Sequence, residues 1–119
     1  MIDRRKALAV LASAAAAWPA LAQDLPDRTI RLIVPFAAGG GVDVLARSFA
    51  VELGKAVNRS VAVENKPSAT GQIGAAEVAK AAPDGSTLVI SSAAFGTTPS
   101  FVPRLPYDIF KDFEPVTIL

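Results

Sequence analysis

The sequence contains no cysteine and no histidine. Disulfides, zinc sites made of these residues, and Ser-His-Asp or Cys-His catalysis therefore cannot be assembled from this chain alone. The excess of positive charge is also small, because 12 Lys and Arg are nearly balanced by 11 Asp and Glu. A nucleic-acid surface needs a clustered basic face. Beyond the three cations at residues 4–6 no such cluster is present, and we expect no nucleic-acid partner.

The first 22 residues have the three parts of a secretory signal peptide. Three cations at residues 4–6 precede an uncharged run, rich in Ala and Leu, that ends in the small-x-small pattern Ala20-Leu21-Ala22. A membrane span needs about 20 apolar residues, and this run is shorter. We expect a signal peptide at residues 1–22, cleavage before Gln23 and a periplasmic protein, by either the Sec or the twin-arginine route. The signal peptide carries three cations and one acid. Its removal therefore changes the formal net charge of the chain from +1 to −1.

The rest of the chain alternates strand and helix patterns. Ile30 to Val34 is an apolar run with β-branched residues, typical of a strand buried on both faces. A loop of small residues follows at 36–41, and Asp43 then opens a helix with an apolar stripe. The stripe has an apolar residue at every fourth position with alanines beside it: Leu45, Phe49, Leu53 and Val57, flanked by Ala46, Ala50 and Ala56.

The second half repeats this order. It reads as a strand at 61–63, a loop at 65–71, a helix at 73–81, a strand at 87–90 and a loop at 91–98. A β-α-β-α-β order predicts an α/β fold with a parallel sheet and right-handed crossovers. Ligands of such sheets bind beyond the carboxyl ends of the strands, where the three loops meet. A short turn packed by two phenylalanines is expected near the end: Tyr107, Asp108, Phe110, Lys111, Asp112 and Phe113.

Three glycines, Gly39 to Gly41, lead into the first helix. Glycines permit a tight turn with exposed N–H groups, and a helix N-terminus adds partial positive charge, which together suit an anionic oxygen. A tight strand-to-helix turn without any binding role would explain the same three glycines. A dinucleotide fingerprint is only partly matched, because Val44 replaces its third glycine while Glu64 occupies the place of a ribose-binding acid. Asp43 can likewise be a helix cap rather than a functional acid.

Several motifs, taken together, resemble the periplasmic binding proteins of tripartite tricarboxylate transporters, the Bug-type receptors. They are spread over the whole chain after the signal peptide in one register. The motifs are Pro26-Asp27-Arg28, Ile33-Val34-Pro35-Phe36, Ala38-Gly39-Gly40-Gly41 with Asp43, Val63-Glu64-Asn65-Lys66-Pro67, Gly71-Gln72-Ile73-Gly74, Ala82-Pro83-Asp84-Gly85, Leu105-Pro106-Tyr107-Asp108 and Lys111-Asp112-Phe113-Glu114-Pro115-Val116.

The resemblance implies two α/β domains of the type II periplasmic-binding-protein kind that close on a small di- or tricarboxylate-like solute. It implies no enzymatic activity, no cofactor and no metal. The expected partners are the carboxylate and the membrane components of the transporter, with a monomer at full length. The loop from Phe36 to Asp43 and the loop from Ser91 to Thr97 would form two lips of the pocket. The expected site residues are Phe36, Ala38, Gly39, Gly40, Gly41, Asp43, Ser91, Ser92, Ala93 and Thr97.

The chain departs from the family in two ways. Val42 stands where a hydroxyl residue is usual, and Ser68 and Thr70 replace glycines of the second loop. The family is also about two to three times longer, as two domains require. We therefore expect residues 23–119 to be a partial first domain without the second. Two alternatives stay open, a nucleotide-binding domain of an oxidoreductase and a truncated remnant without a ligand.

Overall fold

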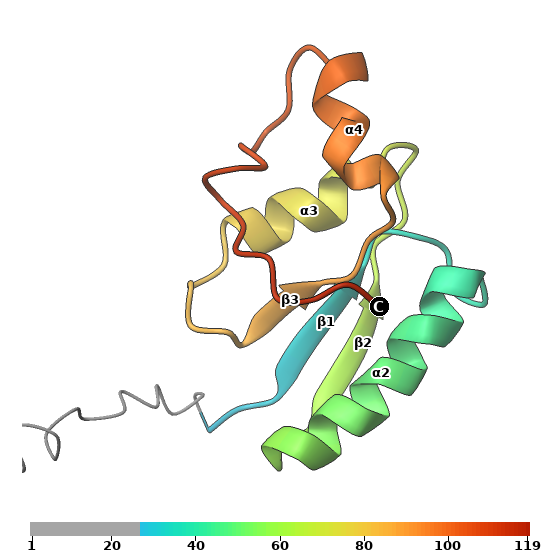
Figure 1. The fold of residues 1–119 in the computed structure, drawn as a ribbon, viewed down its shortest axis with the longest axis vertical. Coiled ribbons are helices and arrows are strands. Elements are labelled where there is room, and N and C mark those ends of the chain that lie inside the picture. The colour runs from blue at the N-terminus through green and yellow to red at the C-terminus, as the bar shows by residue number, and fades with distance from the viewer. Residues whose placement is uncertain (1–26) are drawn as a thin grey trace, which may run out of the picture.

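A computed structural model describes residues 27–119, so the expected signal peptide lies outside the described part. Within residues 27–119, no helix combines the length and the apolar character needed to cross a membrane. Strands and helices alternate along the chain (Figure 1). In order, they are β1 (Ile30–Val34), α2 (Gly41–Val57), β2 (Val61–Asn65), α3 (Gln72–Ala79), β3 (Thr87–Val89) and α4 (Ala94–Phe101).

The three strands form one parallel sheet with β1 in the middle, in the order β2-β1-β3. Leu32 lies opposite Val63 on one side and Leu88 on the other. Helix α2 packs against β1 and β2, and helix α3 packs against β1 and β3. The predicted α/β fold with a parallel sheet is therefore confirmed.

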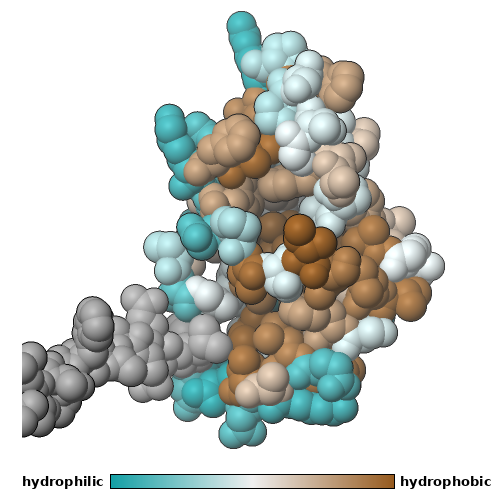
Figure 2. Space-filling view, in the orientation of Figure 1, coloured by the Kyte–Doolittle hydropathy of each residue, from teal (hydrophilic) through white to brown (hydrophobic). Residues whose placement is uncertain are grey.

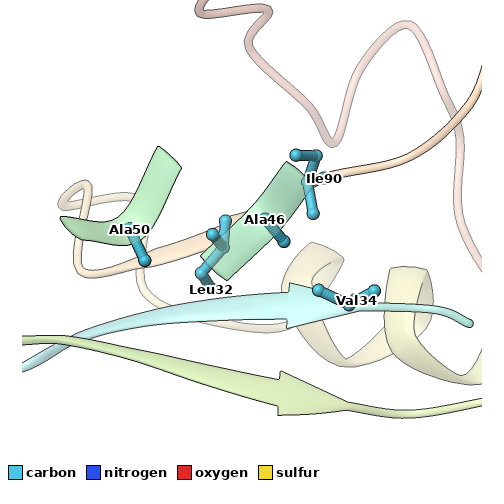
Figure 3. Packing of buried hydrophobic residues seen from close by; sticks show 5 residues of the cluster. All are labelled: Leu32, Val34, Ala46, Ala50 and Ile90. Atoms are coloured by element: carbon cyan, nitrogen blue, oxygen red, sulfur yellow. The ribbon is translucent and has the colours of Figure 1, made fainter. Parts of the chain in front are cut away.

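Alternate residues of β1 serve the two helices. Leu32 and Val34 form a buried cluster with two alanines of α2 and with Ile90, which follows β3 (Figure 3). Alanines at the contact let the helix backbone approach the sheet closely. Because neighbouring strand residues point to opposite faces, the buried Ile33 serves the α3 face. The core is thus divided between the two faces of a central strand.

The predicted apolar stripe of α2 is only partly correct. Phe49, Leu53 and Val57 are partly buried, but Leu45 is 46% exposed. The helix face that meets the sheet runs through Ala46 and Ala50, the predicted alanines beside the stripe, and Phe49 packs against the same cluster. This happens because small side chains permit the closest approach, so they, rather than the largest residues, determine the rotation of the helix. Apolar surface remains exposed on the shown face of the molecule (Figure 2).

Helix α3 lies against the opposite face through a glycine. A Cβ atom added at Gly74 would lie 3.1 Å from Cγ2 of Ile33, 3.3 Å from Cγ of Pro35 and 3.3 Å from Cβ of Lys66. Real Cβ contacts are rarely this close, so a larger residue would push α3 away from the sheet. The close packing of α3 thus depends on Gly74.

The expected loop at 91–98 is wrong beyond Ala93, because α4 begins at Ala94. Glycine and proline are poor helix formers, and α4 contains Gly96 and Pro99, which is why the letters favour a loop. Tertiary packing overrides that preference. The ring of Phe95 stacks on that of Tyr107 with centroids 6.0 Å apart, and it meets the ring of Phe113 edge-on.

The turn after Tyr107 forms as predicted, but one of its two expected anchors is wrong. Asp108 accepts the N–H of Phe110 at 2.9 Å and Asp112 accepts the N–H of Asp108 at 2.7 Å. Phe113 packs edge-on against Tyr107, with ring centroids 5.5 Å apart. Phe110 instead is 87% exposed, because the turn directs the two phenylalanines to different sides.

Candidate functional site

The loops at the carboxyl edge of the sheet begin side by side. Lys66 N–H donates to the carbonyl of Val34 at 2.8 Å, and Ile90 N–H donates to the carbonyl of Ile33 at 3.0 Å. The loops that follow β1, β2 and β3 therefore leave the sheet at one edge, as parallel pairing requires. This is the edge at which ligands of α/β sheets bind.

The N-terminus of α2 opens toward this edge. Gly40 is the N-cap residue and has no side-chain cap, and the first helical hydrogen bond runs from Val44 N–H to the Gly40 carbonyl at 3.0 Å. The N–H groups of the first turn, including those of Gly41 and Val42, have no acceptor four residues before them inside the helix. Residues 38–41 are exposed. Such an uncapped helix start can accept an anionic oxygen.

Only one of the three glycines needs to be glycine for its backbone angles. Gly39 has φ of 83°, in the left-handed region that favours glycine, whereas Gly40 has φ of −77° and ψ of 169°, which any residue can adopt. A Cβ atom at Gly39 or Gly41 would meet no heavy atom within 4 Å. The loop is therefore turned by Gly39, and the space around the helix start is open.

Asp43 lies in the first turn of α2, as expected, but it is buried, with 2% of its surface exposed. Its Oδ2 accepts the N–H of Gly39 at 2.8 Å and Nε–H of Arg47 at 2.9 Å. Its Oδ1 accepts Nδ2–H of Asn65 at 2.9 Å. The Asn65 amide also donates to the carbonyl of Phe36 at 3.2 Å and accepts from Nη2 of Arg47 at 3.2 Å.

These donors keep Asp43 ionised. The Arg47 guanidinium, followed by the Gly39 N–H and the Asn65 amide, lowers the pKa of Asp43 from 3.8 to about 2. A carboxylate that accepts several hydrogen bonds is stabilised in its charged form. At neutral pH the side chain is an anion whose charge is engaged by its own loop and helix.

The expected second lip, residues 91–97, is held differently from the loop at 36–43. Ser91 is partly buried, while Ser92 and Ala93 are exposed just before α4. The Ser92 carbonyl accepts the N–H of Phe95 at 2.9 Å, and the Thr97 hydroxyl donates to the Ala94 carbonyl at 3.0 Å. Thr97 thus bonds within its own helix. Among the described residues, no hydrogen bond joins 36–43 to 91–97.

Two residues of the cluster, Asn65 and Arg47, were not predicted as site residues. Asn65 ends β2 at the same edge as the glycine loop, and an amide at that strand position is the signal that could have indicated it. Arg47 lies one turn after Asp43 on α2, at the i, i+4 spacing of an ion pair. The structure therefore brings Phe36, Gly39 and Asp43 together with Asn65 and Arg47.

Glu64 does not fit the ribose-binding alternative. Its two carboxylate oxygens accept bonds from Nε and Nη2 of Arg31, each at 2.7 Å. Arg31 also donates to Glu77 of α3 at 2.6 Å, and Lys66 lies 3.5 Å from Glu77. The carboxylate of Glu64 is thus part of an ion-pair network that joins two strands to α3.

Two hollows in residues 27–119 lie away from the helix start. A hollow of about 390 Å³ runs along α3, so it does not contain the glycine loop. Residues 27–119 hold no group of three acidic side chains arranged for a metal ion. The candidate site is therefore an open edge. The hollow is lined by Gln72, Ile73, Ala76, Glu77, Lys80 and Pro106.

Comparison with known families identifies the chain. Residues 45–119 match the family described as the tripartite tricarboxylate transporter family receptor. The chain belongs to this family of transport receptors, which confirms the resemblance seen in the motifs. Among curated relatives, BugT of Bordetella pertussis is 40% identical over 111 residues, 92% of this chain and 34% of that protein. The chain spans about a third of the length of the curated relatives that it matches.

Solved structures show the same fold. A structure described as a periplasmic transporter is 46% identical, with a TM-score of 0.70 over 77% of this chain and 31% of its own. MatC from Rhodopseudomonas palustris, solved with bound malate, is 44% identical, with a TM-score of 0.51 over 54% of this chain and 22% of its own. A second R. palustris protein, solved with adipate, is 39% identical, with a TM-score of 0.53 over 56% and 22%.

Proposed function

We propose that the protein containing this chain captures a small di- or tricarboxylate-like solute in the periplasm and delivers it to the membrane components of a tripartite tricarboxylate transporter, without catalysis. The uncapped N-terminus of α2 behind the glycine loop carries this proposal. Family membership and the malate and adipate found in two related structures support the ligand class.

The chemistry of the site suits a carboxylate. Free N–H groups at Gly41 and Val42 can donate to one carboxylate group, and the helix dipole favours its charge. These donors are backbone groups rather than a side-chain cation. The guanidinium of Arg47 is engaged by Asp43 and Asn65. The remaining contacts, including those to a second carboxyl group, are assigned to the second lip at 91–97 and to a second domain.

The domain assignment belongs to the same proposal. Residues 1–22 are the signal peptide, removed after Ala22, and residues 23–119 are part of the first of two α/β domains. The full-length receptor is a monomer that closes on its ligand. Mass spectrometry of the periplasmic protein tests the export step directly, because the mature N-terminus should be Gln23. Intact Met1 found only in the cytoplasm would contradict it.

The ligand class is tested by calorimetric titration of the full-length protein with malate, adipate and NAD. We expect saturable binding of at least one dicarboxylate and none of NAD, with inorganic phosphate as a control for unspecific anion binding. Binding of NAD without any response to carboxylates would instead support the nucleotide-binding alternative. No binding of either dicarboxylate by a folded full-length protein would contradict the proposed ligand class.

A further inference from the structure

We infer that Asp43 and Asn65 are positioning residues of the carboxylate site, which hold the glycine loop in its binding shape without contacting the ligand. This inference rests on the proposed function. It differs from the expectation drawn from the sequence, in which Asp43 lines the pocket itself. The structure offers the cluster of Asp43, Asn65 and Arg47 as a separate layer behind the loop.

The first argument is access. The side chain of Asp43 is 3% exposed, and both of its oxygens are occupied by donors of the protein. A ligand hydroxyl or ammonium group would have to displace Asn65 or Arg47 to reach it. Gly41 at the helix start, in contrast, is exposed, and a Cβ atom added there would meet no heavy atom within 4 Å. The ligand-binding donors and the buried acid are therefore different groups.

The second argument is how the loop is held at both ends. The Asn65 amide donates to the carbonyl of Phe36, where the loop starts, and to Asp43, just after it ends. Asn65 itself is fixed because it pairs with Val34 in the sheet. Asp43 adds a bond to the N–H of Gly39, the residue with positive φ. One amide and one carboxylate thus tie the turn to the sheet.

The third argument is electrostatic. An anion bound at the helix start would be repelled by a bare carboxylate in the same first turn. Arg47 sits 2.9 Å from Asp43 and offsets this charge through a charge-assisted hydrogen bond. The cluster therefore gives the loop a rigid support at little electrostatic cost. A loop that is ordered before binding loses less conformational freedom when the ligand arrives.

The test uses the full-length protein with the variants Asp43→Ala and Asn65→Ala, titrated with malate and with adipate. Substitution of residues that orient metal ligands costs about ten- to a hundredfold in affinity, and we take the same range for residues that orient this loop. We expect a loss in this range that is the same factor for both ligands, because a mispositioned loop affects the shared carboxylate contact. Asp43→Asn should lose less, since an amide oxygen still accepts the N–H of Gly39.

Asp84→Ala is the matched control. Asp84 also accepts a backbone N–H, from Ser86 at 3.0 Å, and also pairs with an arginine, Arg28, but it lies at the opposite end of the sheet. It should lower the thermal unfolding temperature while leaving both affinities unchanged. A second readout is amide hydrogen exchange, in which Asp43→Ala should expose the N–H of Gly39 selectively.

The outcomes distinguish a positioning role of Asp43 from direct contact with the ligand. Losses that differ between malate and adipate, or a changed preference in Asp43→Asn, would mean that Asp43 contacts the ligand and would overturn the inference. Wild-type affinity in Asp43→Ala would overturn it as well. If the wild-type protein binds neither ligand, the proposed function fails, and unchanged Gly39 exchange in Asp43→Ala would show separately that Asp43 does not hold the loop.

Discussion

The two lips at the carboxyl edge of the sheet are held by different means. The first, residues 36–43, is fixed by side chains from elsewhere, namely the Asn65 amide and the Arg47 guanidinium. The second, residues 91–97, bonds only within itself and its helix among the described residues, and it has no charged side chain. Its long-range anchor is the ring of Phe95 against Tyr107 and its neighbours.

This difference suggests a division of labour. Directional hydrogen bonds to a buried charge fix a backbone in one geometry, which suits a loop whose N–H groups must aim at a ligand. Aromatic packing holds a segment in place with weaker directional demands. The first lip is therefore a prepared site, and the second is a surface whose position depends on the residues near 107–113. The predictions below disrupt the contacts that hold each lip, first at 36–43 and then at 91–97.

The largest effect is expected from acid on the first lip. Because the pKa of Asp43 is lowered from 3.8 to about 2, its contribution is complete above pH 4 and is lost as pH falls through about 2. The amide chemical shift of Gly39 in the ligand-free protein should thus be constant from pH 8 to about 4 and then move, with a midpoint near pH 2. Asp43→Asn removes this transition, and amides of 91–97 should not report it. A midpoint at or above the ordinary value of 3.8 would contradict the cluster.

Next in size is the substitution Gly39→Ala. Its φ of 83° costs a residue with a Cβ atom about 1–2 kcal/mol, although no atom obstructs the space. We expect that loss in the free energy of unfolding, measured by urea denaturation of the full-length protein. Gly40→Ala is the matched control, since its φ is ordinary and its Cβ would meet only the Ala37 carbonyl at 3.5 Å. Equal losses in both would show that the turn is not held as described.

A smaller effect is expected at the second lip from Phe113→Ala. The ring of Phe113 packs edge-on against Phe95 at 5.3 Å and against Tyr107 at 5.5 Å between centroids. Such a pair contributes about 0.5–1.5 kcal/mol beyond the area that it buries. Amides of α4 should exchange faster while those of β1 keep their rates. Unchanged exchange in α4 would rule out this anchor.

Tyr107→Phe is the control for that experiment and the smallest change. It keeps the ring and removes a buried hydroxyl that has no hydrogen-bond partner within residues 27–119. A buried polar group without a partner costs about 1–3 kcal/mol, so its removal should not destabilise the protein.

Local patterns predicted most of the fold because local chemistry decides it here. The β-branched run at Ile30 to Val34 and the spaced apolar residues of α2 define their elements without help from distant parts. Helix α4 was missed because Gly96 and Pro99 oppose a helix locally, and only the packing of Phe95 reveals it. In α2 the sequence indicated the alanines that meet the sheet, Ala46 and Ala50, but not that Leu45 beside them stays exposed.

The candidate site was predictable as a place more than as a mechanism. Glycines before a helix indicate an anion site, and parallel strands indicate the edge at which it lies. The role of Asn65 depends on the pairing of β2 with β1, which brings together residues 22 positions apart in the case of Asn65 and Asp43. Which glycine needs positive φ also follows from the bond between Gly39 and Asp43, and no composition rule states it.

The central claim is that backbone N–H groups at the start of α2 bind the carboxylate. Calorimetric titration of Gly40→Val with malate, in the full-length protein, tests it most directly, because valine can adopt the extended angles of Gly40 and should obstruct the anion without unfolding the chain. Loss of one hydrogen bond to a charged group, about 1.5–3 kcal/mol, predicts an affinity about ten- to a hundredfold weaker than wild type. Wild-type affinity in a variant with normal thermal unfolding would show that the carboxylate binds elsewhere.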